Sequence, residues 1–187
     1  EFSNFVYTPT PMGSPPTAAN VTVSPFTAVA GEPGITFNGA FTAAAGATVD
    51  YAITYTVTTT DGSKISDAYL GIGGFVNNGG TGSVSIGETI LNSSGTAISK
   101  VPFEVFTSPS PGLSSDTTPL TPPDTTITVQ KDITVFGGSN GAAFSFTNQG
   151  FSTTTTAIPE PASMALLGIG LSGLFTLRRL FRRTSVA

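Results

Sequence analysis

Short runs in which apolar and polar residues alternate, separated by glycine and proline, most constrain how this chain can fold. In the clearest run, Tyr51, Ile53, Tyr55 and Val57 alternate with Ala52, Thr54, Thr56 and Thr58. A period of two gives a β-strand one buried and one solvated face. Further strands are expected at 35–41, 65–72, 83–91, 97–106, 126–136 and 143–147. Because no amphipathic helix precedes the C-terminal segment, we predict an all-β fold, a single antiparallel β-sandwich of immunoglobulin-like or jelly-roll type.

Turn residues and one charge add detail to this expectation. Asp61 and Gly62 follow the clearest strand and predict a hairpin to the strand at 65–72. Residues 108–124 contain five prolines and are expected to form a long loop, since proline cannot donate to a central ladder. Lys131 falls in the apolar phase of its strand, which predicts either a bulge or an inward charge guarding an edge strand.

The N-terminal residues 1–24 are rich in proline and are expected to form an extended arm before a sandwich domain at 25–151. Phe2, Phe5, Val6 and Tyr7 are too apolar for a solvated linker. They are candidates either for docking on their own domain or for strand exchange, in which the arm adds a strand to a neighbour's sheet.

Composition excludes most catalytic and metal chemistry. The chain has no Cys and no His, which removes thiol nucleophiles, imidazole bases and the usual zinc ligands. Five acids, Asp50, Asp61, Asp67, Glu88 and Glu104, are candidates for paired-carboxylate catalysis, but no spacing selects a pair, and we interpret them as turn or outward strand positions. We therefore expect a protein that is not an enzyme and that has no cofactor and no metal site.

The body of the chain is acidic. Before Pro159, three Lys oppose ten Asp and Glu, a net charge of 3 − 10 = −7, and all the Arg lie in the last ten residues. This balance disfavours nucleic-acid binding by the body.

The C-terminal residues form a membrane-insertion pattern. A Ser/Thr spacer at 152–158 precedes Pro159, Glu160 and Pro161, and residues 162–177 carry no charge. An apolar helix at about 162–181 is expected, and the Arg cluster should remain in the cytoplasm under the positive-inside rule. The sandwich would then lie on the outer side of the membrane. The cluster comprises Arg178, Arg179, Arg182 and Arg183.

This order of Pro-Glu-Pro, apolar helix and Arg cluster in residues 159–187 resembles the PEP-CTERM sorting signal of bacterial exosortase substrates. The resemblance implies export, processing by an exosortase-like enzyme at Pro159 to Pro161, and delivery to the cell surface or an extracellular matrix. The encoded precursor is then expected to begin with a secretion signal. Small residues in the helix, Gly168, Ser172 and Gly173, would let two such helices approach closely in a membrane or an assembly.

Two hypotheses of function follow. The first is a non-enzymatic surface or matrix protein that self-associates into filaments through its N-terminal arm or its C-terminal helix. The alternative is a surface-displayed binding module or adhesin for a carbohydrate or protein ligand, whose fold would be the same. Asn20 and Asn92 also fit the N-glycosylation pattern and are candidate sites in an exported chain.

Overall fold

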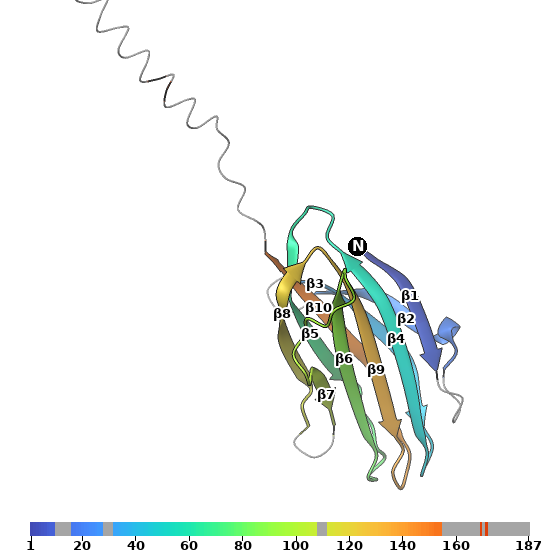
Figure 1. The fold of residues 1–187 in the computed structure, drawn as a ribbon. Coiled ribbons are helices and arrows are strands. Elements are labelled where there is room, and N and C mark those ends of the chain that lie inside the picture. The colour runs from blue at the N-terminus through green and yellow to red at the C-terminus, as the bar shows by residue number, and fades with distance from the viewer. Residues whose placement is uncertain (10–15, 28–31, 108–111, 155–168, 170, 172–187) are drawn as a thin grey trace, which may run out of the picture. The chain divides into compact units, whose positions relative to one another are not determined.

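The computed structural model describes residues 1–9, 16–27, 32–107, 112–154, 169 and 171. Two five-stranded sheets pack face to face, and β6, β9, β4 and β1 are visible side by side in Figure 1. Sheet A has the order β1 (Phe2–Pro9), β4 (Thr48–Thr58), β9 (Thr126–Phe136), β6 (Ser83–Asn92) and β7 (Glu104–Phe106). Sheet B has the order β2 (Thr22–Thr27), β3 (Pro33–Ala43), β10 (Ala142–Thr154), β5 (Lys64–Gly73) and β8 (Ser115–Asp124). All pairings are antiparallel, which confirms the predicted sandwich.

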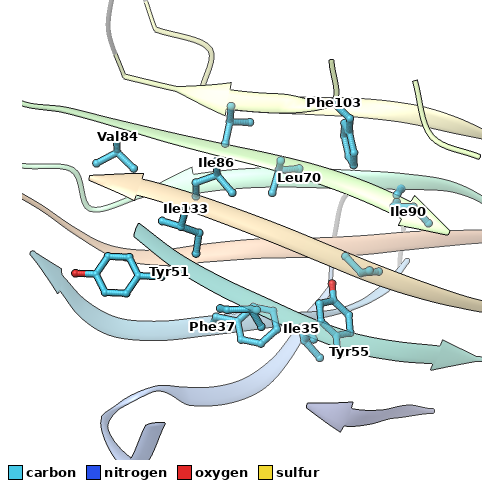
Figure 2. Close-up of a cluster of buried hydrophobic side chains, with 14 of the residues drawn as sticks. Ile35, Phe37, Tyr51, Tyr55, Leu70, Val84, Ile86, Ile90, Phe103 and Ile133 are labelled. Atoms are coloured by element: carbon cyan, nitrogen blue, oxygen red, sulfur yellow. The ribbon is translucent and has the colours of Figure 1, made fainter. Parts of the chain in front are cut away.

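The core lies between the two sheets and consists of the apolar phase of each strand. Tyr51 and Tyr55 of β4 are fully buried, as the alternation predicts. Figure 2 shows side chains from both sheets gathered in this layer. Phe41 stacks on Phe144 with ring centroids 4.6 Å apart and meets Tyr51 edge-on at 5.3 Å. Offset and edge-to-face contacts of this kind stabilise an aromatic core beyond its buried area.

The predicted hairpin at Asp61 and Gly62 is wrong, although the turn itself is present. The Asp61 carboxylate accepts hydrogen bonds from Ser63 N at 3.0 Å and Ser63 Oγ at 2.6 Å, and Gly62 has φ +77°. However, β4 pairs with β1 and β9 in sheet A, whereas β5 pairs with β10 and β8 in sheet B. The turn therefore carries the chain from one sheet to the other. A local turn signal does not specify which sheet the next strand joins.

The N-terminal segment belongs to the sandwich. β1 pairs with β4 at one edge of sheet A, and β2 pairs with β3 at one edge of sheet B. A short 3-10 helix, η1 (Ala18–Asn20), lies between them. The expected boundary after residue 24 thus falls inside β2, and the expected spacer at 152–158 begins inside β10.

The proline-rich stretch is not a loop throughout, which corrects the prediction for 108–124. Residues 115–124 form β8, which pairs only with β5 and is therefore an edge strand. Edge strands tolerate proline because one side of the strand needs no ladder partner. The expected strand at 97–106 is shorter than predicted, because only 104–106 form β7 and Ala97 makes an isolated bridge with Leu91.

The expected C-terminal helix at 162–181 lies outside the described residues except for Ile169 and Leu171, which are helical. Within the ranges that the structure describes, we find no helix with the length and hydropathy needed to cross a membrane.

Candidate functional site

A groove of about 490 Å³ lies on the outer face of sheet A, over β4, β9 and β6. The segment just before β7 forms one wall. Its lining comprises Ala52, Thr54, Gly87, Glu88, Thr89, Val101, Pro102, Phe103, Glu104, Gln130, Lys131 and Asp132. This volume is within the range of ligand sites in proteins.

The floor of the groove is a row of residues in register across four strands. Ala52 faces Asp132, Asp132 faces Gly87, and Gly87 faces Glu104. A Cβ placed on Gly87 would meet no atom within 4 Å, so the missing side chain leaves open space in the floor. Asp132 and Glu104 are two strands apart, roughly 9–10 Å by the usual strand spacing. Two carboxylates therefore flank an open, small-residue floor.

The rest of the lining divides into a polar row and an apolar wall. Thr54, Gln130 and Thr89 form the next cross-strand row and offer hydroxyl and amide groups that both donate and accept hydrogen bonds. On the wall, Val101 is 88% exposed beside Pro102. The groove thus presents hydrogen-bonding groups below and an apolar surface at one side.

The lining carries negative charge without an available cation. Lys131 contributes to the lining, but its ammonium group is buried in the core and pairs with Glu88. The nearby Lys100 ammonium lies 2.5 Å from the Asp116 carboxylate. Asp132 and Glu104 therefore set the local field, which disfavours an anionic ligand.

A buried polar cluster lies on the core side of the same strands. It consists of Glu88, Lys131, Gln149 and Tyr55. Lys131 Nζ is 2.5 Å from Glu88 Oε1, and it donates a hydrogen bond of 3.1 Å to Gln149 Oε1. The side chains of Glu88 and Lys131 have no solvent exposure. Gln149 Nε2 and Tyr55 Oη are buried without a hydrogen-bond partner of ordinary geometry among the described residues.

Two sequence predictions are corrected by this cluster. Lys131 is an inward charge on the central strand of sheet A, so neither a bulge nor an edge-guarding charge describes it. Glu88, expected to point outward, is buried directly opposite Lys131 in the β6–β9 register. The pairing explains both corrections, because each charge compensates the other in a region without water.

Burial dominates the protonation equilibria of the cluster. Burial raises the pKa of Glu88. This effect outweighs the charge and hydrogen bond of Lys131 and the Gln149 amide, all of which lower the pKa. Burial lowers the pKa of Lys131, and this effect outweighs the opposite effect of Glu88. The pKa of Tyr55 is also raised, first by burial and then by the charge of Glu88. Each shift favours the neutral form of its group.

Of the residues singled out from the sequence, the groove lining includes Glu88, Glu104 and Lys131, and the side chains of Glu88 and Lys131 are buried beneath it. Asn20 is exposed in η1, and the Asn92 side-chain oxygen accepts hydrogen bonds from Ser94 N and Thr96 N. The sorting residues, the small helix residues and the Arg cluster lie outside the described residues. They are Pro159, Glu160, Pro161, Gly168, Ser172, Gly173, Arg178, Arg179, Arg182 and Arg183.

The aromatic residues of the N-terminal segment pack on the core of their own chain. Phe2 contacts the rings of Tyr55 and Phe151 at 6.4 and 6.1 Å, and Tyr7 stacks on Tyr51 at 6.4 Å. Phe5 is 44% exposed and Val6 is 56% exposed. The predicted exchange of this segment between copies is not tested by these contacts and stays a prediction.

Sequence reasoning missed the groove. The sequence pattern that could have indicated it lies in the solvent-facing positions of three strands, where Ala52 and Gly87 are small and Asp132 is charged. Aligning these positions requires the strand order and register, which alternation alone does not supply. Within the described part of the chain, no group of three or more Asp or Glu residues is arranged to hold a metal ion.

Comparison with known proteins identifies the C-terminal segment. The PEP-CTERM protein-sorting motif matches residues 157–183, as the sequence predicted. This motif implies processing by an exosortase, export and association with the cell surface. No curated protein matches the chain.

Several solved structures resemble the sandwich at low identity. The carbohydrate-binding module TmCBM61, in complex with beta-1,4-galactotriose, is 13% identical with a TM-score of 0.41, over 82% of this chain and 91% of that one. A carbohydrate-binding module from the β-sandwich superfamily is 13% identical with a TM-score of 0.37, over 81% and 57%. The enzymatically active domain of bacteriophage CBA120 tailspike protein 4 is 15% identical with a TM-score of 0.35, over 80% and 20%. These similarities concern strand arrangement and carry no information on a ligand.

Proposed function

We propose that this exported surface protein is a non-enzymatic binding module that holds a hydroxyl-rich polymer, uncharged or cationic, in the groove of sheet A. The supporting observation is the row Ala52, Asp132, Gly87 and Glu104, which combines an open floor with two carboxylates. A glycan chain fits this chemistry. Its hydroxyl groups pair with the Thr and Gln row, while its C–H faces pack on Val101 and Pro102.

Charge narrows the ligand class. Because the ammonium group of Lys131 is buried and Asp132 and Glu104 have no other cation in the lining, a polyanion would be desolvated against like charge. A neutral polysaccharide avoids this penalty, and the ammonium groups of an amino polysaccharide are attracted by the two carboxylates.

The non-enzymatic part of the proposal rests on the available reactive groups. The chain has no Cys or His. The one described carboxyl group whose pKa is raised, that of Glu88, is sealed in the core without solvent exposure. A general acid must reach its substrate, and Glu88 does not.

Self-assembly through exposed strand edges has less support, because all four edges of the sandwich have features that discourage strand addition. β7 has three residues, β2 contains Pro25, β8 contains Pro119, Pro122 and Pro123, and the β1 register shifts between Ser3 and Val6. Short strands, prolines and bulges are the usual protections against edge pairing. Filament formation therefore remains the second hypothesis.

The test is affinity electrophoresis of the full chain through gels containing polysaccharides of different charge. Galactan and xylan provide neutral probes, chitosan a cationic probe and polygalacturonate an anionic probe. We expect retardation by at least one neutral or cationic polymer and none by the anionic one. Retardation only by the polyanion, or by none of the polymers, would contradict the proposal.

A matched pair of variants assigns the binding to the groove. Gly87→Ile places a branched side chain in the open floor, whereas Ser85→Ile adds the same side chain on the same exposed face of β6 outside the groove lining. Gly87→Ile should abolish retardation and Ser85→Ile should preserve it, with both variants folded by circular dichroism. Equal retardation of the two variants would place the binding site elsewhere.

A further inference from the structure

The buried polar cluster places an amine, a carboxyl group and a carboxamide together inside the sandwich. Lys131 Nζ lies 2.5 Å from Glu88 Oε1 and 3.1 Å from Gln149 Oε1. Glu88 Oε2 and Gln149 Nε2 are buried without a hydrogen-bond partner of ordinary geometry among the described residues. Buried polar atoms are usually hydrogen-bonded, because each unsatisfied one costs free energy.

The surroundings of the cluster favour uncharged groups. Lys131 lies between Ile53 of β4 and Glu88 of β6 in sheet A. Gln149 lies between Ile35 of β3 and Leu70 of β5 in sheet B. In such an apolar environment, transfer of a proton from the ammonium to the carboxylate leaves a neutral amine and a neutral acid, which removes both buried charges. A neutral amine is a nucleophile, whereas an ammonium is not.

We propose that Lys131 and Gln149 join in a covalent amide bond, an isopeptide cross-link between the two sheets, with Glu88 as the proton carrier. The neutral Lys131 Nζ attacks Cδ of Gln149, while the protonated Glu88 carboxyl group polarises the Gln149 carbonyl oxygen. The bond between Cδ and Nε2 then breaks. Glu88 takes a proton from Nζ and gives one to the departing Nε2, so the products are one secondary amide and one ammonia, and Glu88 returns to its starting state.

Gln149 is a better electrophile for this site than Glu88 itself. Condensation of Lys131 with Glu88 would consume the only acid in the cluster and release water. Reaction with Gln149 keeps the acid available through both proton transfers. It also places the departing amide nitrogen close to the acid, since the Gln149 amide lowers the pKa of the Glu88 carboxyl group.

The position of the bond suggests its use. Lys131 is on β9, the central strand of sheet A, and Gln149 is on β10, the central strand of sheet B. The chain has no cysteine, so no disulfide can join the two sheets. A cross-link here would stop the sheets from separating and would protect an exported protein from unfolding and proteolysis.

The test is mass spectrometry of the purified full chain, followed by denaturation and digestion with trypsin. We expect an intact mass lower than that of the sequence by one ammonia. Trypsin should fail to cut after Lys131, leaving residues 101–178 as one peptide with Lys131 joined to Gln149. An intact mass equal to that of the sequence, with cleavage after Lys131, would overturn the proposal. A deficit of one water located at Lys131 and Glu88 would also overturn it.

Matched variants separate this reaction from other losses of ammonia. Lys131→Met and Gln149→Met should each restore the full mass, whereas Lys100→Met, which removes a surface lysine paired with Asp116, should keep the deficit. Glu88→Met should also show the full mass, because the proton carrier is absent. A deficit that persists in Lys131→Met would refute the cross-link, and one that persists in Glu88→Met would refute the role of Glu88. If a variant does not fold, the peptide map of the unaltered chain still decides the question.

Discussion

Replacing Phe5 tests whether β1 belongs to its own sandwich. Phe5 stacks on Tyr55 with ring centroids 5.5 Å apart and meets Phe37 edge-on at 6.1 Å. The neighbouring Val6 is 56% exposed and carries no ring that could stack on them. We therefore expect Phe5→Ala to destabilise the domain and Val6→Ala to have little effect.

The magnitude follows from burial and ring contacts. Full burial of a Phe side chain contributes about 1.5–3 kcal/mol, and Phe5 is 44% exposed, so its transfer contribution is roughly 1 kcal/mol. Two aromatic contacts add about 0.5–1.5 kcal/mol each. The expected loss is therefore about 2–4 kcal/mol, which lowers Tm by roughly 4–16 °C in a domain of this size. Val6→Ala should cost less than about 1 kcal/mol.

The assay is thermal unfolding of both variants and of the unaltered chain, followed by circular dichroism over a roughly hundredfold range of protein concentration. If β1 pairs within its own chain, Tm does not depend on concentration. If β1 is exchanged between copies, Tm rises with concentration, because association then contributes to stability. Equal Tm values for Phe5→Ala and Val6→Ala would refute the packing described above, and a concentration-dependent Tm would revive the strand-exchange hypothesis.

Two further predictions concern backbone space and alkaline pH. Gly34→Ala should cost about 2–3 kcal/mol or more, because its Cβ would collide with the Gln149 carbonyl oxygen, whereas Gly87→Ala should be neutral or stabilising by up to ~1 kcal/mol. Urea unfolding measures both, and equal losses would contradict the backbone geometry. Burial, with a smaller effect of Tyr51, raises the pKa of Tyr7 from 10.0 to about 12. The folded state thus holds this proton more tightly, so the stability from Tyr7 is complete below pH 10 and is lost as pH rises toward 12. In urea unfolding, Tyr7→Phe should reduce the loss of stability between pH 10 and 12. An unchanged loss would show that other groups cause it.

The strands were predictable where alternation was regular. The expected strand at 126–136 coincides with β9, and the strand with Tyr51 and Tyr55, expected at 49–59, differs from β4 by one residue at each end. Both regions place an apolar residue at nearly every second position, so local sequence was enough to define strand and buried face. The sorting motif was also recognisable, because its features lie within one short segment.

The candidate site and the buried cluster were less predictable because they depend on neighbours distant in sequence. Lys131 is explained by Glu88 on an adjacent strand and by Gln149 on the opposite sheet. No spacing in the sequence indicates that these three side chains meet. Similarly, the turn at Asp61 was recognised, but its role as a crossing between sheets was not.

The sequence by itself thus determined the class of fold, the faces of the regular strands and the sorting signal at the C-terminus. These properties follow from short-range periodicity and composition, which act within a strand or a segment. Strand order and register were decided only by the tertiary structure. They place Ala52, Asp132, Gly87 and Glu104 in one row, and they enclose Lys131 with Glu88 and Gln149. The physical reason is that burial and strand pairing depend on contacts between residues distant in sequence. The native arrangement is the one in which all of these contacts are favourable together.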